Sequence, residues 1–214
     1  MTDKTLRLER RRLSDLPPLA SLTAAELLFL TGTPLVDPSD LAALTALRVL
    51  SLKQTRITDI APLVRLTRLQ SLNLSFTAVQ DIAPLAHLTG LQSLYLTGTL
   101  VRDIAPLARL TQLTRLDLGG SAVADLTPLS RLHALESLQL SSTQVTDLTP
   151  LRQLSQLRVL ELGDTPVRDL SPLAGLTALR RLDIRGTQAD DTGIPIGCQR
   201  VSAETFRRRQ PAGV

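Results

Sequence analysis

The sequence predicts an α/β solenoid, in which short strands and tight turns alternate along one elongated body. A 22-residue phrase recurs in seven registered copies from Leu47 onward, as in LQSLYLTGTLVRDIAPLARLTQ beginning at Leu91. The same period counted backward adds units at Ala25 and Asp3, so eight full repeats fill 3–178 and a broken ninth follows. Leucine, aspartate and proline recur at fixed positions of each unit. Repetition at this period is typical of a solenoid rather than of a globule with one central core.

The composition agrees with an ordered chain that has an aliphatic core. Hydrophobic residues make up 43% of the 214 residues, whereas aromatic residues make up only 2% and tryptophan is absent. Because one period covers most of the chain, no internal domain boundary is expected. The expected divisions are an N-terminal capping repeat over 1–24, repeats over 25–191, and a C-terminal cap with a basic tail over 192–214.

Each unit is expected to begin with one short strand. Positions 1, 4 and 6 of the unit are apolar, as in Leu91, Leu94 and Leu96. Because side chains of a strand alternate between its faces, Leu94 and Leu96 are predicted to point inward, and the residues between and after them outward. Strands at the same phase of successive units must then be parallel and about 4.8 Å apart.

Two polar columns are expected to satisfy the backbone where the chain leaves the strand. Position 9 carries a hydroxyl in eight units, beginning at Thr33, whereas the first unit has Arg11 there. Position 13 is aspartate in all nine units, and a cation ladder or a helical cap are the two interpretations. Because a calcium site needs six or more converging oxygens, capping of the next turn is favoured. The aspartates are Asp15, Asp37, Asp59, Asp81, Asp103, Asp125, Asp147, Asp169 and Asp191.

Proline at position 16 predicts short turns opposite the strands. The residue before proline avoids the α region, so most units are expected to make a single tight or 3₁₀ turn. The second unit differs, because its Pro38 directly follows the capping residue Asp37. A short true α-helix is expected there.

The charge is distributed in a way that argues against nucleic acid as a partner. The net charge is +4, but residues 25–191 carry fifteen basic and sixteen acidic groups. The basic excess lies in 1–24, with five basic and three acidic groups, and in 192–214, with four and one. A balanced middle is a poor footprint for a polyanion.

The phrase LxxLxLxxTxxxDxxPLxxL resembles the leucine-rich repeats, especially the 22-residue class of bacterial internalins and of the leucine-rich regulatory subunit of type 1 protein phosphatase. The resemblance covers 3–191. It implies a right-handed leucine-rich repeat solenoid with its parallel sheet on the concave face and short 3₁₀ or α turns on the convex face, and it implies protein binding by the concave face. The usual asparagine at position 9 is threonine or serine here. The segment ITDIAPL and the preference for arginine over lysine resemble features of bacterial members of this class.

The expected binding residues are the outward positions of the strands. Position 5 carries aromatic residues in the first half and acids in the second, and three of the four aromatic residues of the chain lie at or beside it. Exposed aromatic side chains are frequent interface anchors, although Phe76 at position 8 is open to a second interpretation, packing at the edge of the solenoid. Neighbouring charges, such as Arg115 with Asp117, are explained either by cross-strand pairing or by a partner. The candidate residues are Phe29, Ser51, Asn73, Phe76, Tyr95, Arg115, Asp117, Gln139, Glu161 and Asp183.

Little in the sequence indicates catalysis, a cofactor or a metal site. His87 and His133 fall on the turn side of different units, and Cys198 has no partner cysteine for a disulfide. No apolar run is long enough to span a membrane, and the start of the chain lacks a signal-peptide pattern. A non-enzymatic, monomeric and cytoplasmic protein is expected, with export by a specialised system as an alternative location.

The chain end is expected to cover the last coil. Ile194, Ile196, Val201 and Phe206 are its candidate capping residues, with a short helix beginning at Ser202. The function favoured by the sequence is a scaffold that binds another protein through the concave face. The alternative is a binder of nucleic acid or acidic surfaces that uses the basic ends, including the tail Arg207–Arg209.

Overall fold

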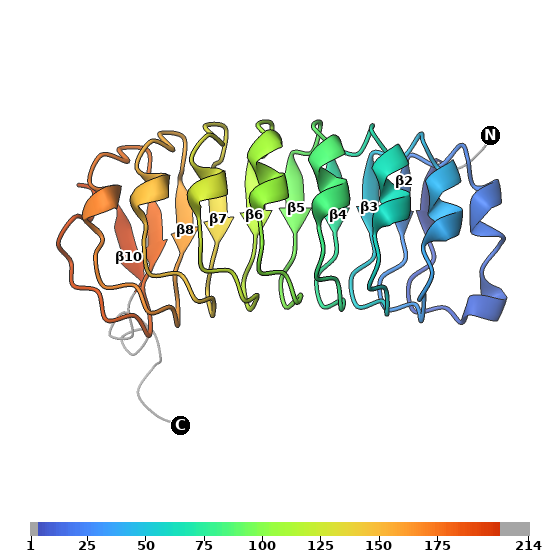
Figure 1. Ribbon diagram of the computed structural model, residues 1–214, viewed down its shortest axis with the longest axis horizontal. Helices are drawn as coiled ribbons and strands as arrows, with labels where there is room; N and C mark the ends of the chain where they lie inside the picture. The colour runs from blue at the N-terminus through green and yellow to red at the C-terminus, as the bar shows by residue number, and fades with distance from the viewer. Residues whose placement is uncertain (1–3, 202–214) are drawn as a thin grey trace, which may run out of the picture.

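A single open sheet of ten parallel strands, paired in chain order, forms the concave face of a right-handed solenoid (Figure 1). The computed structural model describes residues 4–201. The strands are β1 Thr5–Arg7, β2 Leu27–Phe29, β3 Val49–Ser51, β4 Ser71–Asn73, β5 Ser93–Tyr95, β6 Arg115–Asp117, β7 Ser137–Gln139, β8 Val159–Glu161, β9 Arg181–Asp183 and β10 Gln199–Val201.

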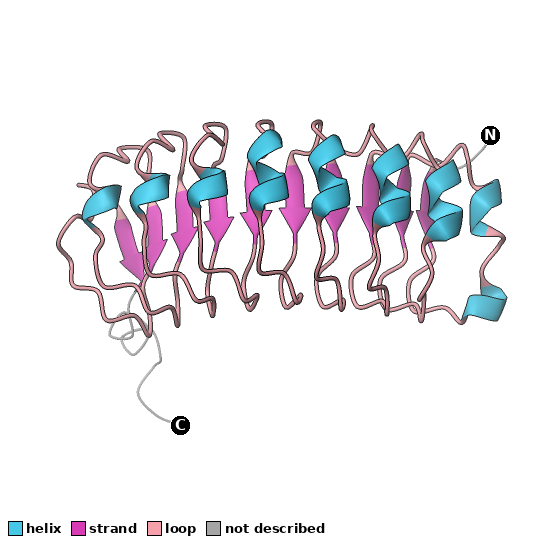
Figure 2. Cartoon of the chain, viewed as in Figure 1, coloured by secondary structure: helices cyan, strands magenta, loops and turns pink. Residues whose placement is uncertain are grey.

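Short 3₁₀ helices form the opposite, convex face, in front of the strands in Figure 2. They are η1 Leu13–Asp15, η2 Leu19–Ser21, η3 Ser39–Ala43, η4 Ala61–Arg65, η5 Ala83–His87, η6 Ala105–Arg109, η7 Thr127–Leu129, η8 Thr149–Leu151 and η9 Ser171–Leu173. Every helix between residues 4 and 201 is of this type. The α-helix expected in the second unit is therefore wrong. The Leu44 N–H bonds to the Leu41 carbonyl three residues back, and the chain then turns toward the next strand.

The strand register follows the 22-residue period. Leu72 on β4 pairs with Leu94 on β5, and Leu94 is followed by Leu116 on β6. Leu94 and Leu96 are fully buried, as predicted for the inward positions. Successive coils thus stack leucine on leucine, and this explains how a chain with few aromatic residues builds a continuous core.

The aspartate column caps the convex turns, as predicted. In seven units a carboxylate oxygen accepts the backbone N–H two residues on, as Asp103 Oδ1 does from Ala105 at 2.8 Å. The other six bonds are made by Asp37, Asp59, Asp81, Asp125, Asp147 and Asp169. The two end units differ. Asp15 precedes Pro17, which has no N–H to donate, and Asp191 instead pairs with Arg200 while Asp190 accepts from Thr192.

The hydroxyl column bonds to its own turn rather than to the next coil. Thr99 Oγ1 donates to the Leu96 carbonyl at 2.7 Å, and the same bond recurs from Thr55 to Thr187. Thr33 is the exception, because its buried hydroxyl has no hydrogen-bond partner among the described residues. The short hydroxyls therefore add a second hydrogen bond to turn carbonyls such as that of Leu96, which also accepts the Thr99 N–H.

The last coil is closed by a strand that the sequence did not indicate. β10 pairs with β9 at a spacing of 18 residues, from Arg181 to Gln199, so it lies outside the repeat period. Ile194 and Cys198 pack against the core, as expected for a cap, but Ile196 is fully exposed. Phe206, the helix expected from Ser202 and the tail Arg207–Arg209 lie outside the described residues.

Candidate protein-binding surface

Two strands carry an aromatic side chain on the concave face. Phe29 and Tyr95, both at position 5, are half-buried on β2 and β5. The guanidinium carbon of Arg7 lies 4.6 Å from the centroid of the Phe29 ring. In the strand register Ser51 on β3 and Asn73 on β4 lie between the two aromatic residues. Ser51 is buried and Asn73 half-buried.

Phe76 lies at position 8, where every unit adopts a left-handed backbone. The φ angle is positive at this position in all nine units, from Arg10 to Gly186.

 The nine residues at this position are Arg10, Gly32, Gln54, Phe76, Gly98, Gly120, Ser142, Asp164 and Gly186. A bulky side chain is disfavoured there, yet Phe76 has φ +57° and is 52% exposed. Its ring lies 5.6 Å from the ammonium of Lys53 and contributes nothing to the buried core.

Several polar residues at position 5 bond to their own strand end. Among the described residues the N–H at position 7 has no backbone acceptor, and a side chain two residues earlier supplies one, as Asp117 Oδ1 does for Gly119 at 3.0 Å. The same bond is made by Asn73, Gln139 and Asp183. These four candidates therefore have a structural role, which the sequence analysis did not recognise.

The charged half of the face pairs differently from the sequence expectation. Glu161 lies between Gln139, which donates to it at 2.6 Å, and Arg181, whose guanidinium is 3.7 Å away. Asp183 pairs with Arg185 at 2.6 Å and is only 1% exposed, so it offers no surface to a partner. Hydrogen bonding to Asp183 raises the pKa of Arg185.

The ten candidate residues thus separate into groups. Ser51 and Asp183 are buried, and this differs from the expectation that the whole column is exposed. Asn73, Asp117, Gln139 and Glu161 are half-buried, and Arg115 is exposed. The aromatic residues Phe29, Phe76 and Tyr95 contribute the least to the structure of the solenoid itself. We call the region from β2 to β5 that carries these three residues the aromatic half.

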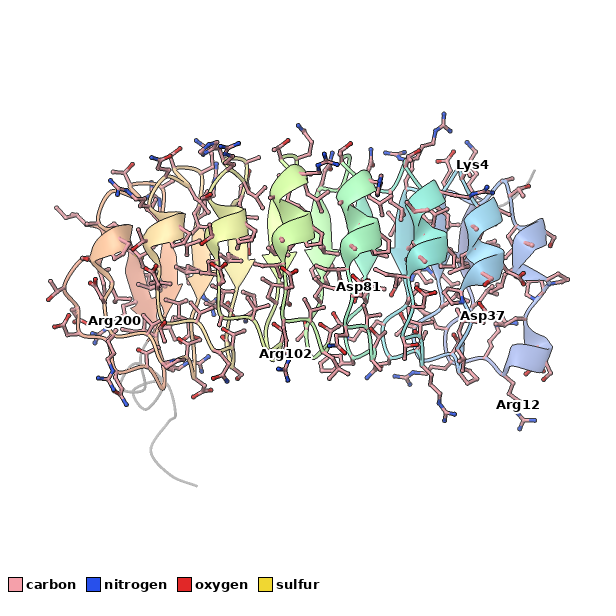
Figure 3. All side chains as sticks on the ribbon, in the orientation of Figure 1. Lys4, Arg12, Asp37, Asp81, Arg102 and Arg200 are labelled. Atoms are coloured by element: carbon pink, nitrogen blue, oxygen red, sulfur yellow. The ribbon has the colours of Figure 1, made fainter. Side chains whose placement is uncertain are left out.

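The charged side chains of the edges and of the convex face form no catalytic constellation in the described part of the chain. Figure 3 shows Lys4 at the edge where the strands begin, and Arg12 and Arg102 at the edge where the strands end. His87 and His133 are exposed on different units, and no group of three metal-binding side chains occurs among residues 4–201. Burial raises the pKa of the Cys198 thiol, and this disfavours the reactive thiolate. None of the described helices has the length and hydropathy needed to cross a membrane.

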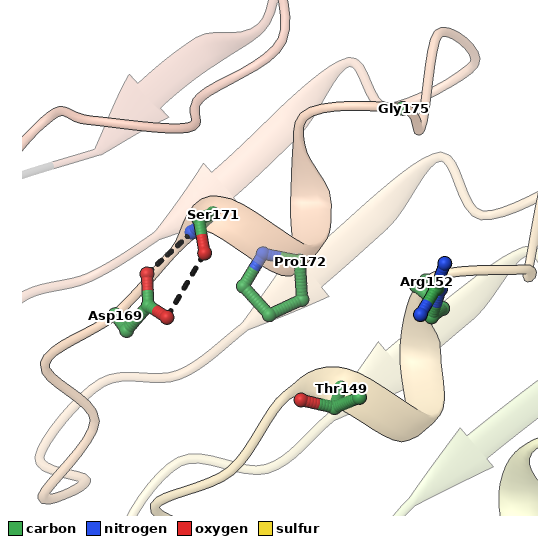
Figure 4. A pocket seen from close by; sticks show the side chains of 6 residues that line it. All are labelled: Thr149, Arg152, Asp169, Ser171, Pro172 and Gly175. Carbon is green, nitrogen blue, oxygen red and sulfur yellow. Dashed lines mark hydrogen bonds between the residues drawn. The ribbon is translucent and has the colours of Figure 1, made fainter.

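A groove of about 460 Å³ on the convex side lies between η8 and η9 (Figure 4). Its carboxylate, Asp169, accepts from the Ser171 N–H through one oxygen and from the Ser171 hydroxyl through the other. These bonds lower the pKa of Asp169, so this acid is a cap held in its charged form. The groove has polar walls without a nucleophile and base in contact, and it is a poorer candidate than the aromatic half.

Comparison with known proteins identifies the class. The family model for leucine-rich repeats, a model of two repeat copies, matches residues 45–87 and 67–109. Internalin C2 of Listeria monocytogenes strain 4b F2365 is 30% identical, with a TM-score of 0.78 over 86% of this chain and 84% of that chain. An internalin of the same strain, inlF, is 28% identical, with a TM-score of 0.68 over 88% and 72%. The sequence matches no curated protein.

A more distant similarity concerns the fold alone. The plant peptide hormone receptor RGFR1, solved in complex with RGF2, is 18% identical, with a TM-score of 0.73 over 87% of this chain and 32% of that chain. With its repeats, sheet and turns, the chain belongs to the leucine-rich repeat proteins, a family of protein-interaction scaffolds. Within this family it resembles the bacterial internalins, as the sequence indicated.

Proposed function

We propose that the chain is a non-catalytic scaffold that binds another protein through the aromatic half of its concave face. The observation that carries the proposal is the exposure of Phe76 at a left-handed backbone position where four other units have glycine. Such a residue costs conformational energy and contributes no core packing, so a role outside the fold accounts for it. Phe29 and Tyr95 supply two further anchors of the kind that dominate protein interfaces.

The charged half is a weaker candidate because its side chains already satisfy one another. Glu161 has two partners and Asp183 is buried against Arg185. A partner would have to replace these contacts before gaining new ones. Binding by the aromatic half leaves them intact.

The proposal is tested with a double variant, Phe29→Ala/Tyr95→Ala, in affinity capture from the native cell followed by mass spectrometry. The two residues are three strands apart, roughly 14 Å at about 4.8 Å per strand, so one element of a partner can span both. We expect the variant to fold and to lose the partner, since buried aromatic anchors commonly contribute about 2 kcal/mol or more each.

The control is Arg65→Ala/Arg109→Ala, which alters only exposed residues at the ends of η4 and η6. Binding should survive this change. If the convex pair abolishes capture while the aromatic pair does not, the site lies on the turn side.

The alternative, an acidic partner bound by the basic ends, has less support. Arg200, in the C-terminal part of the described chain, already pairs with Asp191. Deletion of Arg207–Arg209 distinguishes the two functions, because collapse of retention on a heparin column would favour the basic ends. We further propose a monomeric, cytoplasmic protein, in keeping with a single cysteine whose thiol is held protonated.

A further inference from the structure

A groove of about 300 Å³ lies beside Phe76, where strands β4 to β7 end. Its lining includes the glycines Gly98, Gly119 and Gly120 and the side chains of Phe76, Asp117 and Gln139. The Phe76 ring packs against Gly98, and Asp117 and Gln139 lie against Gly119, whereas Gly120 is exposed. The groove thus places an aromatic ring and a carboxylate at one sheet end.

The charge of the groove has one sign. Asp117 is the only ionisable side chain among its described lining residues, and no cationic side chain lines it. Arg115 lies on the same strand, but no ion pair between Arg115 and Asp117 occurs in the described part of the chain. The carboxylate inside the groove thus favours a cation. The ammonium of Lys53 lies nearby, 5.6 Å from the centroid of the Phe76 ring.

The hydrogen-bonding capacity of the groove is only partly used. Asp117 Oδ1 accepts from Gly119, whereas Asp117 Oδ2 has no hydrogen-bond partner within residues 4–201. The second oxygen of the carboxylate is consequently available to a donor. Gln139 is committed elsewhere, since its amide donates to Glu161 and its oxygen accepts from Ser141.

We propose that this groove receives an arginine side chain of the partner protein, with the guanidinium on Asp117 and the aliphatic stem beside the Phe76 ring. This inference rests on the proposed function and names the chemistry of one contact. A guanidinium suits a site with an aromatic ring better than an ammonium does, because it is planar and more weakly hydrated. The remaining oxygen of Asp117 supplies a charge-assisted acceptor.

Two variants probe the groove with little risk to the fold. Asp117→Asn removes the charge and keeps the acceptor for Gly119, as Asn73 does for Ser75 in an earlier unit at 2.9 Å. Gly119→Ser fills space beside Asp117, because its β-carbon would meet Asp117 Oδ1 and Gln139 Cγ at 3.3 Å. Thr97 and Ser141 show that this repeat position tolerates a side chain. The matched control is Gly163→Ser, at the same position two units on, where a β-carbon would meet the Ser141 hydroxyl at 3.3 Å.

The first measurement is a titration of the full chain with the blocked tripeptide acetyl-Gly-Arg-Gly-amide, followed by the NMR amide signals of Gly98, Gly119 and Gly120. The same tripeptide with citrulline, which has the shape of arginine without its charge, is the ligand control. We expect the arginine peptide to shift these signals and to bind about tenfold more weakly to Asp117→Asn, the loss of one charged contact. Gly119→Ser should also weaken binding, and Gly163→Ser should not.

The second measurement repeats the capture of the cellular partner with the same variants. Loss of the partner with Asp117→Asn and Gly119→Ser supports the arginine contact. If arginine and citrulline peptides act alike, or neither shifts the glycine signals, the proposed contact is wrong. If Phe29→Ala/Tyr95→Ala abolishes capture while both groove variants retain it, the contact is wrong and the proposed function stands. Retained capture by all of these variants overturns both.

Discussion

The ring of Phe76 lies so close to Gly98 that a β-carbon on Gly98 would come within 2.8 Å of the Phe76 ring. The aromatic residue of one coil thus requires a glycine in the next. Both have a left-handed backbone, but only glycine adopts it without steric cost. The pair shows that the edge of the sheet is shaped by an exposed residue that the core does not need.

We therefore expect Phe76→Gly to leave the free energy of unfolding unchanged or to raise it by up to about 1 kcal/mol. Relief of the strain of a left-handed backbone stabilises the variant. The greater flexibility of glycine in the unfolded chain and the loss of ring contacts act in the opposite direction. Chemical denaturation measures the change, and Gly98→Ala, with φ +62° and the ring in the way, should be destabilised. A loss of several kcal/mol with Phe76→Gly would mean that the ring is part of the core.

The hydroxyl column offers a matched pair of substitutions with opposite signs. Thr99→Val should cost about 1 kcal/mol, because the Leu96 carbonyl loses the hydroxyl that donates to it. Thr33→Val should stabilise by about 1 kcal/mol, because the buried Thr33 hydroxyl has no partner in the described chain. Thermal unfolding of both variants checks the prediction, and equal shifts would contradict the assigned bonds.

Replacement of a capping aspartate should cost a modest amount, independent of metal. Asp103→Ala removes the acceptor for the Ala105 N–H and is expected to lower the free energy of unfolding by about 1 kcal/mol. Added calcium should change the melting temperature of neither protein. A rise of many degrees with calcium would instead indicate that the aspartate column binds cations.

The same column predicts an acid-dependent stability. Hydrogen bonds from the side chain and N–H of Thr127 lower the pKa of Asp125 below its ordinary value of 3.8, and Thr149 does the same for Asp147. A lowered pKa in the folded state stabilises the fold above the pKa of the unfolded chain, and this contribution is lost as the pH falls through the folded value. Urea denaturation at pH values from neutral to below 3.8 measures the loss.

An Asp125→Asn/Asp147→Asn variant keeps two acceptors that do not titrate in this range. Its stability should fall less steeply in acid than that of the parent. Identical slopes would show that other carboxylates account for the acid dependence.

The solenoid, the strand register and the cap positions are predictable from the amino-acid sequence alone, because each follows from the 22-residue period. Leu94 occupies an inward position of its strand, and the leucines 22 residues away occupy the same position of the neighbouring strands. Their register is therefore set, because a shift by one residue would expose all of them. Asp103 caps its own turn, so its role too depends on residues that are close in sequence. Repeats that contact only their neighbours make such local rules sufficient.

Which outward residues are free depends on packing between coils. Asp117 and Asp183 occupy the same repeat position, yet Asp183 is buried beside Arg185 while Asp117 lines an open groove. The sequence pattern does not predict β10, because this strand pairs with the open edge of β9 at a spacing that differs from the 22-residue period. Side-chain contacts across coils and the closing of the last edge depend on distances in space, and a repeat pattern does not encode them.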